Sequence, residues 1–410
     1  MPAASVLDLI GRTPLVEVTR LDTGLCRLFL KLESQNPSGS IKDRPARAMI
    51  EAAEADGRLK EGGTVVRSDV GKGHPDYYQD LALAFTEKTP GAFYANQFEN
   101  PANPASHQAT TAPEIFEDMG WDVDAIVVGV GSGGTLTGIG RYMAKASPKT
   151  EMVLADPAGS ILAPLVETGI MGEAGSWAVE GIGEDFVPPN CDLSLVKKAY
   201  SISDAESFAA SRDLLRKEGI LAGSSSGTLL AAALRYCRGE SEPKRVVTLV
   251  CDSGAKYLSK VFNDAYMAQE GWLGRERTGT VRDVVINRFD EGSEIFVAPN
   301  ETVASAFARM RAADVSQLPV IENDRAVGLV EESDLLDALV RAGPDIGQVF
   351  KTPVGEVMAG KLETISADAP VSELLPLFER GLVPLVMDGS KFLGLVTRID
   401  LINHFRIGAR

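Results

Sequence analysis

The sequence predicts an α/β protein followed by a smaller α+β part, and two observations carry this prediction. Up to about residue 275, short apolar stretches typical of strands alternate with helical patterns, as in proteins whose helices cover a mostly parallel sheet. Beyond Trp272 the pattern changes, and a strand–turn–strand–helix unit occurs twice. We therefore expect one large α/β domain and two small repeated modules.

Length and composition agree with a soluble protein of several domains. The chain of 410 residues is too long for one ordinary core, and its 44% apolar and 24% charged residues are typical of globular proteins. The net charge of −16 argues against nucleic-acid binding. No apolar stretch approaches a membrane span and the N-terminus lacks the features of a signal peptide, so we expect a cytoplasmic protein without a membrane segment.

The cysteines and histidines give no sign of a metal site. The four cysteines form no C-x-x-C pair, which also argues against a disulfide framework. His74, His107 and His404 are scattered along the chain, and we interpret them as surface residues or as hydrogen-bonded structural residues.

One lysine, Lys42, stands out in the first part of the chain. It lies in the Ser- and Gly-rich stretch 36–44, after the strand pattern 28–32 and before the helical pattern 45–55. Backbone N–H groups at the start of a helix favour a nearby anion, so this setting suits a Schiff base with a phosphorylated cofactor. Taken alone, a solvated surface charge is the more common role of a lysine.

A glycine-rich turn follows the buried-strand pattern 124–128 and precedes the helical pattern 135–146. Residues 129–134 match G-x-G-x-x-G, and Asp156 follows at the end of the next strand pattern, as in dinucleotide-binding proteins. The hydroxyl groups of Ser132 and Thr135 instead favour a terminal phosphate monoester. An NAD-dependent enzyme is therefore the competing interpretation.

The rest of the α/β part has a second loop of this kind. Ser203 and Glu206 form a capping-box pattern for a helix that we expect to stop near Gly219. The Ser/Gly-rich loop 219–227 comes next, and we expect a helix over 228–237 and a strand over 246–250 to follow it. This loop could place a hydroxyl against a buried heteroatom, although its simplest interpretation alone is a helix N-cap.

These stretches together resemble the β-family of pyridoxal-phosphate (PLP) enzymes, the cysteine synthases and cystathionine β-synthases. The matching stretches are Ile10–Leu15, Pro37–Arg44, Gln97–Pro104, Gly131–Thr135, Glu180–Gly183 and Gly223–Gly227. The C-terminal repeat is similar to a tandem pair of CBS domains, also called a Bateman module. The resemblance implies a tryptophan-synthase-β-like catalytic domain over 1–272, a linker over 273–284, and CBS domains over 285–342 and 349–410.

The resemblance also implies a role for each site residue. Lys42 holds pyridoxal 5′-phosphate as a Schiff base and then removes the α-proton of the substrate, and Ser225 hydrogen-bonds the pyridine nitrogen. Gln97 contacts the substrate carboxylate. The 5′-phosphate is bound by Gly131, Ser132, Gly133, Gly134 and Thr135, and the entrance is lined by Gly181, Ile182 and Gly183.

Three activities remain open for such a chain. The first is the condensation of serine with homocysteine to give cystathionine, in a homodimer or higher homo-oligomer. The second is an O-acetylserine-dependent cysteine synthase, which would have nearly the same loops. The third is an inactive scaffold whose function is to sense an adenosyl ligand, S-adenosylmethionine or an adenine nucleotide, through the CBS pair.

The third interpretation arises because one family motif is missing. The family has a Ser/Thr-Gly-Asn-Thr-Gly loop, which binds the substrate carboxylate, soon after the strand pattern that ends here at Val66. In this sequence Val66 is followed directly by Arg67-Ser68-Asp69. We therefore expect a truncated N-terminal subdomain and a weakened carboxylate site.

The two regulatory modules also differ from each other. CBS domains typically bind adenosyl ligands through a Gly-h-h-Thr-x-x-Asp stretch, where h is apolar. The second copy retains it, with Thr397 and Asp400, whereas the first has Glu331 in place of the threonine before Asp334. Because a carboxylate there repels phosphate, we expect one ligand at the second motif, or a cationic ligand, or a purely structural pair in which the aspartates cap helices.

Overall fold

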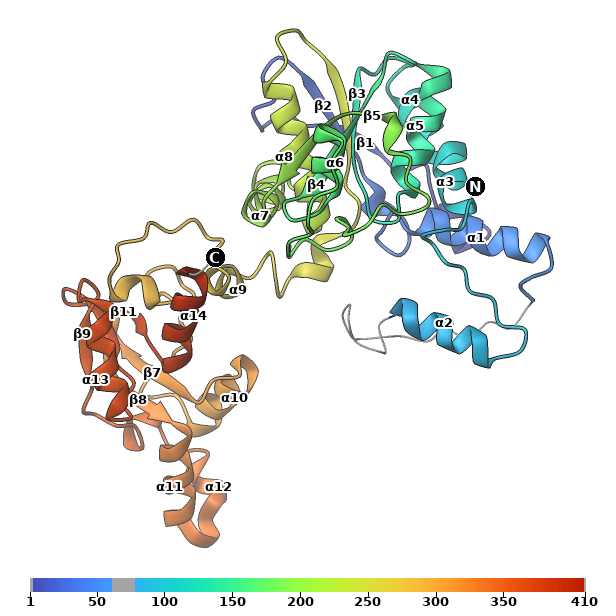
Figure 1. Cartoon of the computed structure of the whole chain (residues 1–410). Helices are drawn as coiled ribbons and strands as arrows, with labels where there is room; N and C mark the ends of the chain where they lie inside the picture. The colour runs from blue at the N-terminus through green and yellow to red at the C-terminus, as the bar shows by residue number, and fades with distance from the viewer. Residues whose placement is uncertain (1–2, 61–77, 409–410) are drawn as a thin grey trace. The chain divides into compact units, whose positions relative to one another are not determined.

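The computed structural model describes residues 3–60 and 78–408, and the chain forms two compact units, Met1–Phe262 and Asn263–Arg410 (Figure 1). The strand pattern that ends at Val66 and the place of the missing loop lie outside the described residues. Within the described ranges, no helix has the length and apolar character needed to cross a bilayer.

Among the described residues, the first unit is built on a six-stranded sheet with the order β1-β2-β6-β3-β4-β5. β1 pairs with β2 in antiparallel fashion, and every other pair of neighbours is parallel, which confirms the predicted α/β class. The strands are β1 (Leu15–Glu17), β2 (Arg27–Lys31), β3 (Ala125–Gly129), β4 (Glu151–Pro157), β5 (Val196–Ile202) and β6 (Arg245–Leu249).

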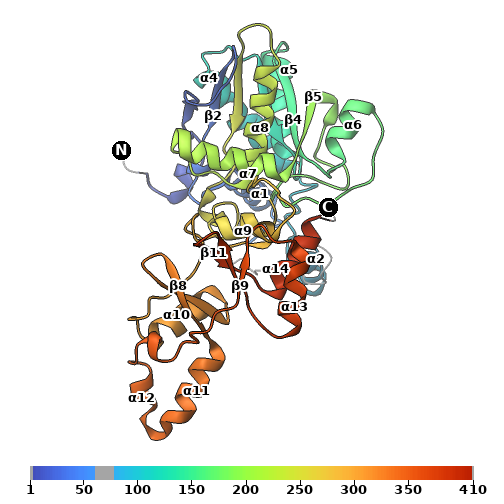
Figure 2. The ribbon, with the colours of Figure 1, turned by 90° about the vertical axis from the view of Figure 1, so that its left-hand side faces the viewer.

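Helices cover both faces of this sheet. Figure 1 shows α7 and α8 on one face and α4 and α5 on the other, and Figure 2 gives the view onto the α8 side. The helices of this unit are α1 (Asp43–Ala55), α2 (Tyr78–Lys88), α3 (Ala102–Ser106), α4 (Ala112–Asp118), α5 (Gly134–Ala146), α6 (Leu162–Thr168), α7 (Asp204–Asp213) and α8 (Ser224–Arg238). Two single π-helical turns, η3 (His107–Thr111) and η5 (Leu214–Glu218), continue α3 and α7.

Local sequence signals fix several of these boundaries. Ser203 and the N3 residue Glu206 form the predicted capping box of α7, and the π-turn after it stops at Gly219, whose φ of 74° suits glycine. The first residue that we predicted for the next helix was wrong. α8 begins at Ser224 rather than residue 228, and its N-cap is Gly223, which makes no side-chain capping bond.

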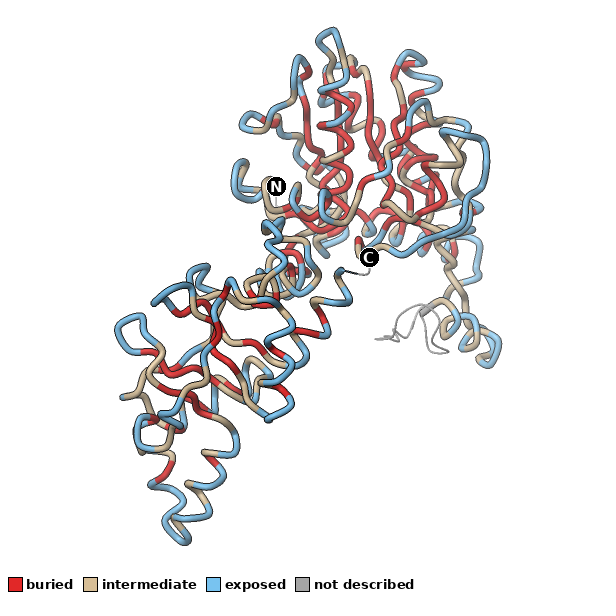
Figure 3. The backbone as a smooth tube through the Cα atoms, turned by 60° about the vertical axis from the view of Figure 1, so that its left-hand side comes forward, coloured by how far each residue is buried: buried red, intermediate tan, exposed pale blue. Residues whose placement is uncertain are grey.

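The core of the first unit lies where α8 packs against the sheet. β3 is inaccessible from Ala125 to Val128, and α8 contacts β3, β4 and β6. Figure 3 shows the buried stretches concentrated in these strands and helices. Each fully buried Val or Leu side chain stabilises the fold by about 1.5–3 kcal/mol, so this layer holds the carboxyl ends of the strands in fixed positions.

The second unit contains the predicted repeat. In the first copy the hairpin β7 (Gln317–Glu322) and β8 (Arg325–Glu331) turns at Asn323 and Asp324, both with positive φ, as two-residue hairpin turns require. In the second copy β10 (Leu385–Asp388) pairs with β11 (Lys391–Leu395) and with β9 (Thr364–Ser366). The helices are α9 (Asp264–Gln269), α10 (Val303–Ala313), α11 (Glu332–Ala342), α12 (Ile346–Val349), α13 (Leu374–Glu379) and α14 (Arg398–Gly408).

Candidate active site

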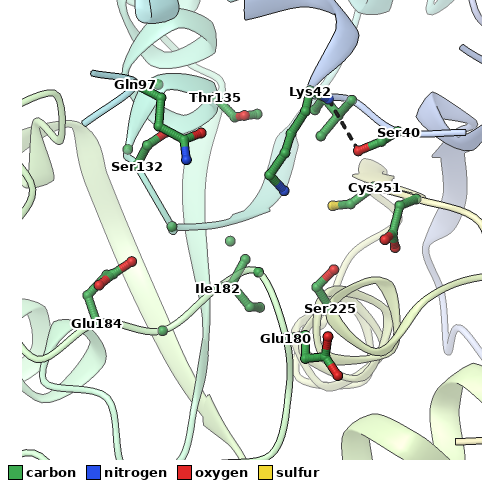
Figure 4. A pocket seen from close by; sticks show the side chains of 18 of the residues that line it. Ser40, Lys42, Gln97, Ser132, Thr135, Glu180, Ile182, Glu184, Ser225 and Cys251 are labelled. Atoms are coloured by element: carbon green, nitrogen blue, oxygen red, sulfur yellow. Dashed lines mark hydrogen bonds between the residues drawn. The ribbon is translucent and has the colours of Figure 1, made fainter. Parts of the chain in front are cut away.

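Lys42 lies at the N-cap position of α1, where its backbone N–H donates to Ser40 Oγ at 3.3 Å. Its side chain lines a cavity of about 490 Å³ at the carboxyl ends of the parallel strands. Figure 4 shows the side chain extending between Ser132 and Thr135 on one side and Ser225 on the other. A volume of this size is typical of small-molecule sites.

A buried ion network holds the first turn of α1. Arg44 donates through Nε to Glu33 Oε2 and through Nη1 to Glu114 Oε1, both at 2.7 Å, and its side chain is 2% exposed. Burial acts to lower the pKa of Arg44, but the two carboxylates raise it, so the guanidinium stays charged. Because Arg44 follows Lys42 by two residues, this network also fixes the backbone that carries the lysine.

The glycine-rich turn between β3 and α5 forms another wall of the cavity. A Cβ atom on Gly131 would lie 2.6 Å from the Gly181 carbonyl oxygen, and one on Gly134 would lie 2.0 Å from Asn103 Oδ1. Gly133, the N-cap of α5, has a φ of 83°, which other residues rarely adopt. The turn therefore needs glycine at three positions, and all five residues from 131 to 135 line the cavity.

This turn can bind a phosphate. It sits at the start of α5, a 13-residue helix whose first backbone N–H groups favour an anion. Ser132 Oγ accepts a hydrogen bond from Asn103 Nδ2 at 2.9 Å, which leaves its own hydrogen available. The absence of side chains on three of the five residues lets a phosphate group approach the backbone, so the cavity fits a ligand with a phosphate near Lys42.

The three serines at the start of α8 are buried and have different partners. Ser224 Oγ accepts from the Glu180 N–H at 3.1 Å, and Ser226 Oγ accepts from the Cys251 N–H at 2.9 Å. Ser225 points into the cavity (Figure 4). The interpretation of these serines as an N-cap was therefore wrong.

The predicted substrate residues line the same cavity. Gln97 is on its wall, and its backbone carbonyl accepts from Asn103 Nδ2 at 2.7 Å. A Cβ on Gly181 would lie 3.8 Å from Lys42 Nζ, and Gly183 donates its N–H to the Val130 carbonyl at 2.8 Å. Gly181 to Gly183 therefore run past both the lysine and the glycine-rich turn.

Three further residues of the cavity were not predicted as site residues. His107 is fully buried, and burial lowers its pKa to about 4, so it is neutral at pH 7. Burial raises the pKa of the Cys251 thiol to about 12 and raises the pKa of Asp252, whose Oδ2 accepts from Tyr257 Oη at 2.9 Å. The position of Cys251 and Asp252, directly after the carboxyl end of β6, could have identified them.

Asp156 does not take the place that a dinucleotide site requires. It is inaccessible, its Oδ2 accepts from the Ala163 N–H at 2.8 Å, and burial raises its pKa to about 6. It is not among the residues that line the cavity. Asp156 therefore holds the start of α6. Within the described ranges, no cluster of His, Cys, Asp and Glu could hold a metal ion.

In the second unit, Thr397 and Asp400 line a cavity of about 670 Å³ together with Glu294 and Asp314. Asp400 Oδ2 accepts from the Thr397 N–H at 2.7 Å and from Thr397 Oγ1 at 2.6 Å, and burial raises the pKa of Asp400. Asp334 does not line this cavity. It accepts from the Glu331 N–H in a capping box at the start of α11.

Comparisons with known proteins agree with this arrangement. The family described as pyridoxal-phosphate dependent enzyme matches in two pieces, residues 6–71 and 60–252, and the CBS domain matches residues 281–341 and 354–407. The chain is 28% identical to a cystathionine beta-synthase of Dictyostelium discoideum, covering 98% of this chain and 92% of that protein. It is 30% identical to the cystathionine beta-synthase of Rattus norvegicus, covering 98% and 77%.

Two solved structures have a similar fold. One is a hydrogen sulfide-producing enzyme from Fusobacterium nucleatum, with a TM-score of 0.58 and 30% identity over 63% of this chain and all of that one. The other is an O-ureido-L-serine synthase, with a TM-score of 0.58 and 30% identity over 64% and 96%. The Dictyostelium alignment extends over 463 positions, more than the 410 residues of this chain, so that relative has residues without a counterpart here.

Proposed function

The chain belongs to the family of pyridoxal-phosphate-dependent enzymes and carries a pair of CBS domains, and from that premise we propose that it condenses L-serine with L-homocysteine to give cystathionine and water. One observation carries the proposal. Lys42, the turn 131–135 and Ser225 come from three distant parts of the sequence and converge on one cavity. The relatives named cystathionine beta-synthase, which align over nearly the whole chain, support the choice of substrates.

We assign the cofactor's contacts to these residues. Lys42 Nζ would hold pyridoxal 5′-phosphate covalently, the turn 131–135 would bind the phosphate, and Ser225 would face the ring nitrogen. When bound, this cofactor withdraws electrons from the α-carbon of an amino acid and makes its proton acidic. Ser225 is neutral, so it would leave the ring a weaker electron sink than a carboxylate partner would, which favours loss of a β-substituent over transamination.

The chain's own groups would carry out the remaining steps. Lys42 Nζ would take the proton from the α-carbon of serine, and the hydroxyl would leave from the β-carbon with that proton as water. The homocysteine sulfur would lose its own proton and bond to the β-carbon, and Lys42 Nζ would return a proton to the α-carbon. Gln97 would orient the substrate carboxylate, and Gly181 to Gly183 would form the entrance wall. Because the Ser/Thr-Gly-Asn-Thr-Gly motif is missing from the sequence, we expect serine to bind weakly.

A cysteine synthase that acts on O-acetylserine is the second candidate. It is favoured by the similarity of the first unit to an O-ureido-L-serine synthase and to a hydrogen sulfide-producing enzyme, each 30% identical. Both activities would use the same Lys42 and differ in the leaving group and the incoming thiol. The products of parallel assays with serine plus homocysteine and with O-acetylserine plus sulfide distinguish them.

We also propose that the cavity at Thr397 and Asp400 binds an adenosyl ligand. Two carboxyl groups of its wall, Asp314 and Asp400, suit S-adenosylmethionine, which is cationic, better than a nucleotide phosphate, whereas burial keeps Glu294 protonated at neutral pH. If the missing motif abolishes turnover, sensing of this ligand would be the remaining function of the chain.

The visible absorption spectrum of the protein with added pyridoxal phosphate tests the proposal. We expect a visible band that is absent in Lys42→Ala and retained in Lys60→Ala, which removes an exposed lysine. Serine should change the band, and serine plus homocysteine should yield cystathionine by mass spectrometry. A Lys42-dependent band that serine leaves unchanged would contradict the proposed activity while leaving the cofactor site in place. The absence of a band would leave the CBS pair as the functional part.

A further inference from the structure

His107 is a buried group in the cavity that none of the proposed steps uses. Its side chain is 1% exposed and lines the cavity. Nδ1 lies 2.9 Å from Thr111 Oγ1, and Nε2 lies 3.3 Å from Thr135 Oγ1, the last residue of the glycine-rich turn. The imidazole therefore connects a helix on the cavity wall to the turn that we assign to the phosphate.

The backbone around His107 gives the ring little room to move. Residues 107–111 form a π-helical turn, a rare feature that is frequently found at functional sites. α5 presses against this turn at Gly138, where a Cβ would lie 2.4 Å from the Pro104 carbonyl oxygen and 2.7 Å from His107 Cβ. The close approach fixes the ring relative to Thr135, which lies in the first turn of the same helix α5.

The ring is also held in its neutral form. Burial lowers its pKa to about 4, with the positive charge of Arg44 acting in the same direction and the negative charge of Glu33 opposing both. A neutral imidazole carries one hydrogen, on either Nδ1 or Nε2, and its two hydrogen-bonding partners determine which.

We propose that His107 is a positioning residue that turns the Thr135 hydroxyl group toward the cofactor phosphate. Thr111 Oγ1 donates its hydrogen to Nδ1, Nε2–H donates to Thr135 Oγ1, and the hydrogen of Thr135 is left free to donate to a phosphate oxygen. This inference rests on the proposed role of residues 131–135 as the phosphate site.

The opposite arrangement of hydrogens does not suit an anion. With the hydrogen on Nδ1, Nε2 would accept the hydrogen of Thr135, and the hydroxyl would present only lone pairs to the phosphate. A hydroxyl that donates to an anion forms one of the stronger classes of hydrogen bond, so the orientation of Thr135 affects how tightly the phosphate is held.

Matched variants test the proposal through two readouts that do not depend on turnover. The first is the dissociation constant for pyridoxal phosphate compared with that for pyridoxal, which lacks the phosphate. The second is the phosphorus NMR shift of the bound cofactor. His107→Asn removes the donor at Nε2, and His107→Gln replaces it with an amide N–H at a similar reach. Thr111→Val removes the partner of Nδ1 with little change in volume, and Thr135→Val removes the hydroxyl itself.

We expect His107→Asn and Thr111→Val to weaken pyridoxal phosphate binding about tenfold, because a hydrogen bond to a charged group is lost. The affinity of these two variants for pyridoxal should stay unchanged, and the phosphorus NMR shift of their bound cofactor should move. His107→Gln should restore most of the affinity for pyridoxal phosphate and most of the original phosphorus shift. Thr110→Val is the matched control, because the Thr110 hydroxyl donates to the Ser106 carbonyl within the helix. It should leave both readouts unchanged.

Three results would overturn the proposal. If Thr135→Val weakens pyridoxal phosphate binding while His107→Asn and Thr111→Val do not, the turn holds the phosphate without help from His107. The same conclusion follows if His107→Asn weakens the binding of pyridoxal and of pyridoxal phosphate equally. Such a loss would show that His107 acts by packing against its neighbours and not through the phosphate. If Thr135→Val itself changes neither readout, the assignment of the turn fails together with the proposal.

Discussion

Glu294 is a carboxyl group of the second unit that lacks the partners an ionised carboxylate needs. Its Oε2 is buried and has no hydrogen-bond partner among the described residues. Burial raises its pKa to about 8, and the nearby Asp400 adds to this shift, while backbone N–H groups at Leu395 and Ile295 oppose it. The folded chain therefore keeps a proton that the unfolded chain releases above pH 4.5.

We predict that the second unit becomes less stable as the pH rises from about 4.5 to about 8, because the unfolded state binds fewer protons than the folded state over this range. Glu294→Gln should remove this dependence and stabilise the unit by about 4 kcal/mol at pH 8, with little effect at pH 4.5. Calorimetric unfolding at both values of pH measures the effect. The matched control Glu322→Gln changes an exposed carboxylate. An equal shift in both variants would contradict the assignment of the pH dependence to Glu294.

At the scale of secondary-structure elements, the sequence predicted the helices and strands whose signals come from residues adjacent in the chain. The apolar pattern gave β3 and β6, and the Ser203–Glu206 pair gave the start of α7. The start of α8 was missed, and the Ser224 hydroxyl there accepts its hydrogen bond from the Glu180 N–H, 44 residues away. His107 was interpreted as a surface residue or a hydrogen-bonded structural residue and not as a site residue, because its contact with Thr135 crosses 28 residues. Such contacts are set by the fold and leave no local pattern.

Helix α1 provides a prediction at this scale, because it is held by a buried ion network at one face and carries an exposed ion pair at another. Arg44→Ala should cost about 3–5 kcal/mol of unfolding free energy, since it leaves the buried Glu33 and the partly buried Glu114 without Arg44. Arg47→Ala removes the exposed pair with Glu51 on the same helix and should cost less than about 1 kcal/mol. Urea unfolding followed by tryptophan fluorescence compares the two. Similar losses would mean that the network does not hold the helix.

At the scale of the whole molecule, each unit has its own core and its own cavity. The two repeats of the second unit contain separate apolar clusters, one around Val303 and Val330 and one around Val285 and Val386. The repeat is nevertheless asymmetric in its polar residues. Asp400 lines a cavity, whereas Asp334 accepts the Glu331 N–H at the start of α11.

We predict that this asymmetry appears in ligand binding to the full chain. Titration calorimetry with S-adenosylmethionine should show one site per chain, and Asp400→Asn should weaken binding about tenfold through loss of a charge. Asp334→Asn, the equivalent change in the other repeat, should leave the affinity unchanged. Equal effects of the two substitutions, or two sites per chain, would contradict the assignment. If no heat of binding is detected, a structural role for the pair of CBS domains is favoured.

The strand order of the large sheet has a consequence for how the chain is made. β6 (Arg245–Leu249) lies between β2 and β3, although it is the last of the six strands to leave the ribosome. Until it emerges, β2 and β3 each present an unpaired edge, and edges of this kind join readily to other chains. Lys42 follows β2 and Ser225 lies on α8, so the place of β6 separates these two residues until β6 is added to the sheet. Newly synthesised chains should therefore depend on chaperones until β6 has left the ribosome, and only afterwards can the cofactor bind.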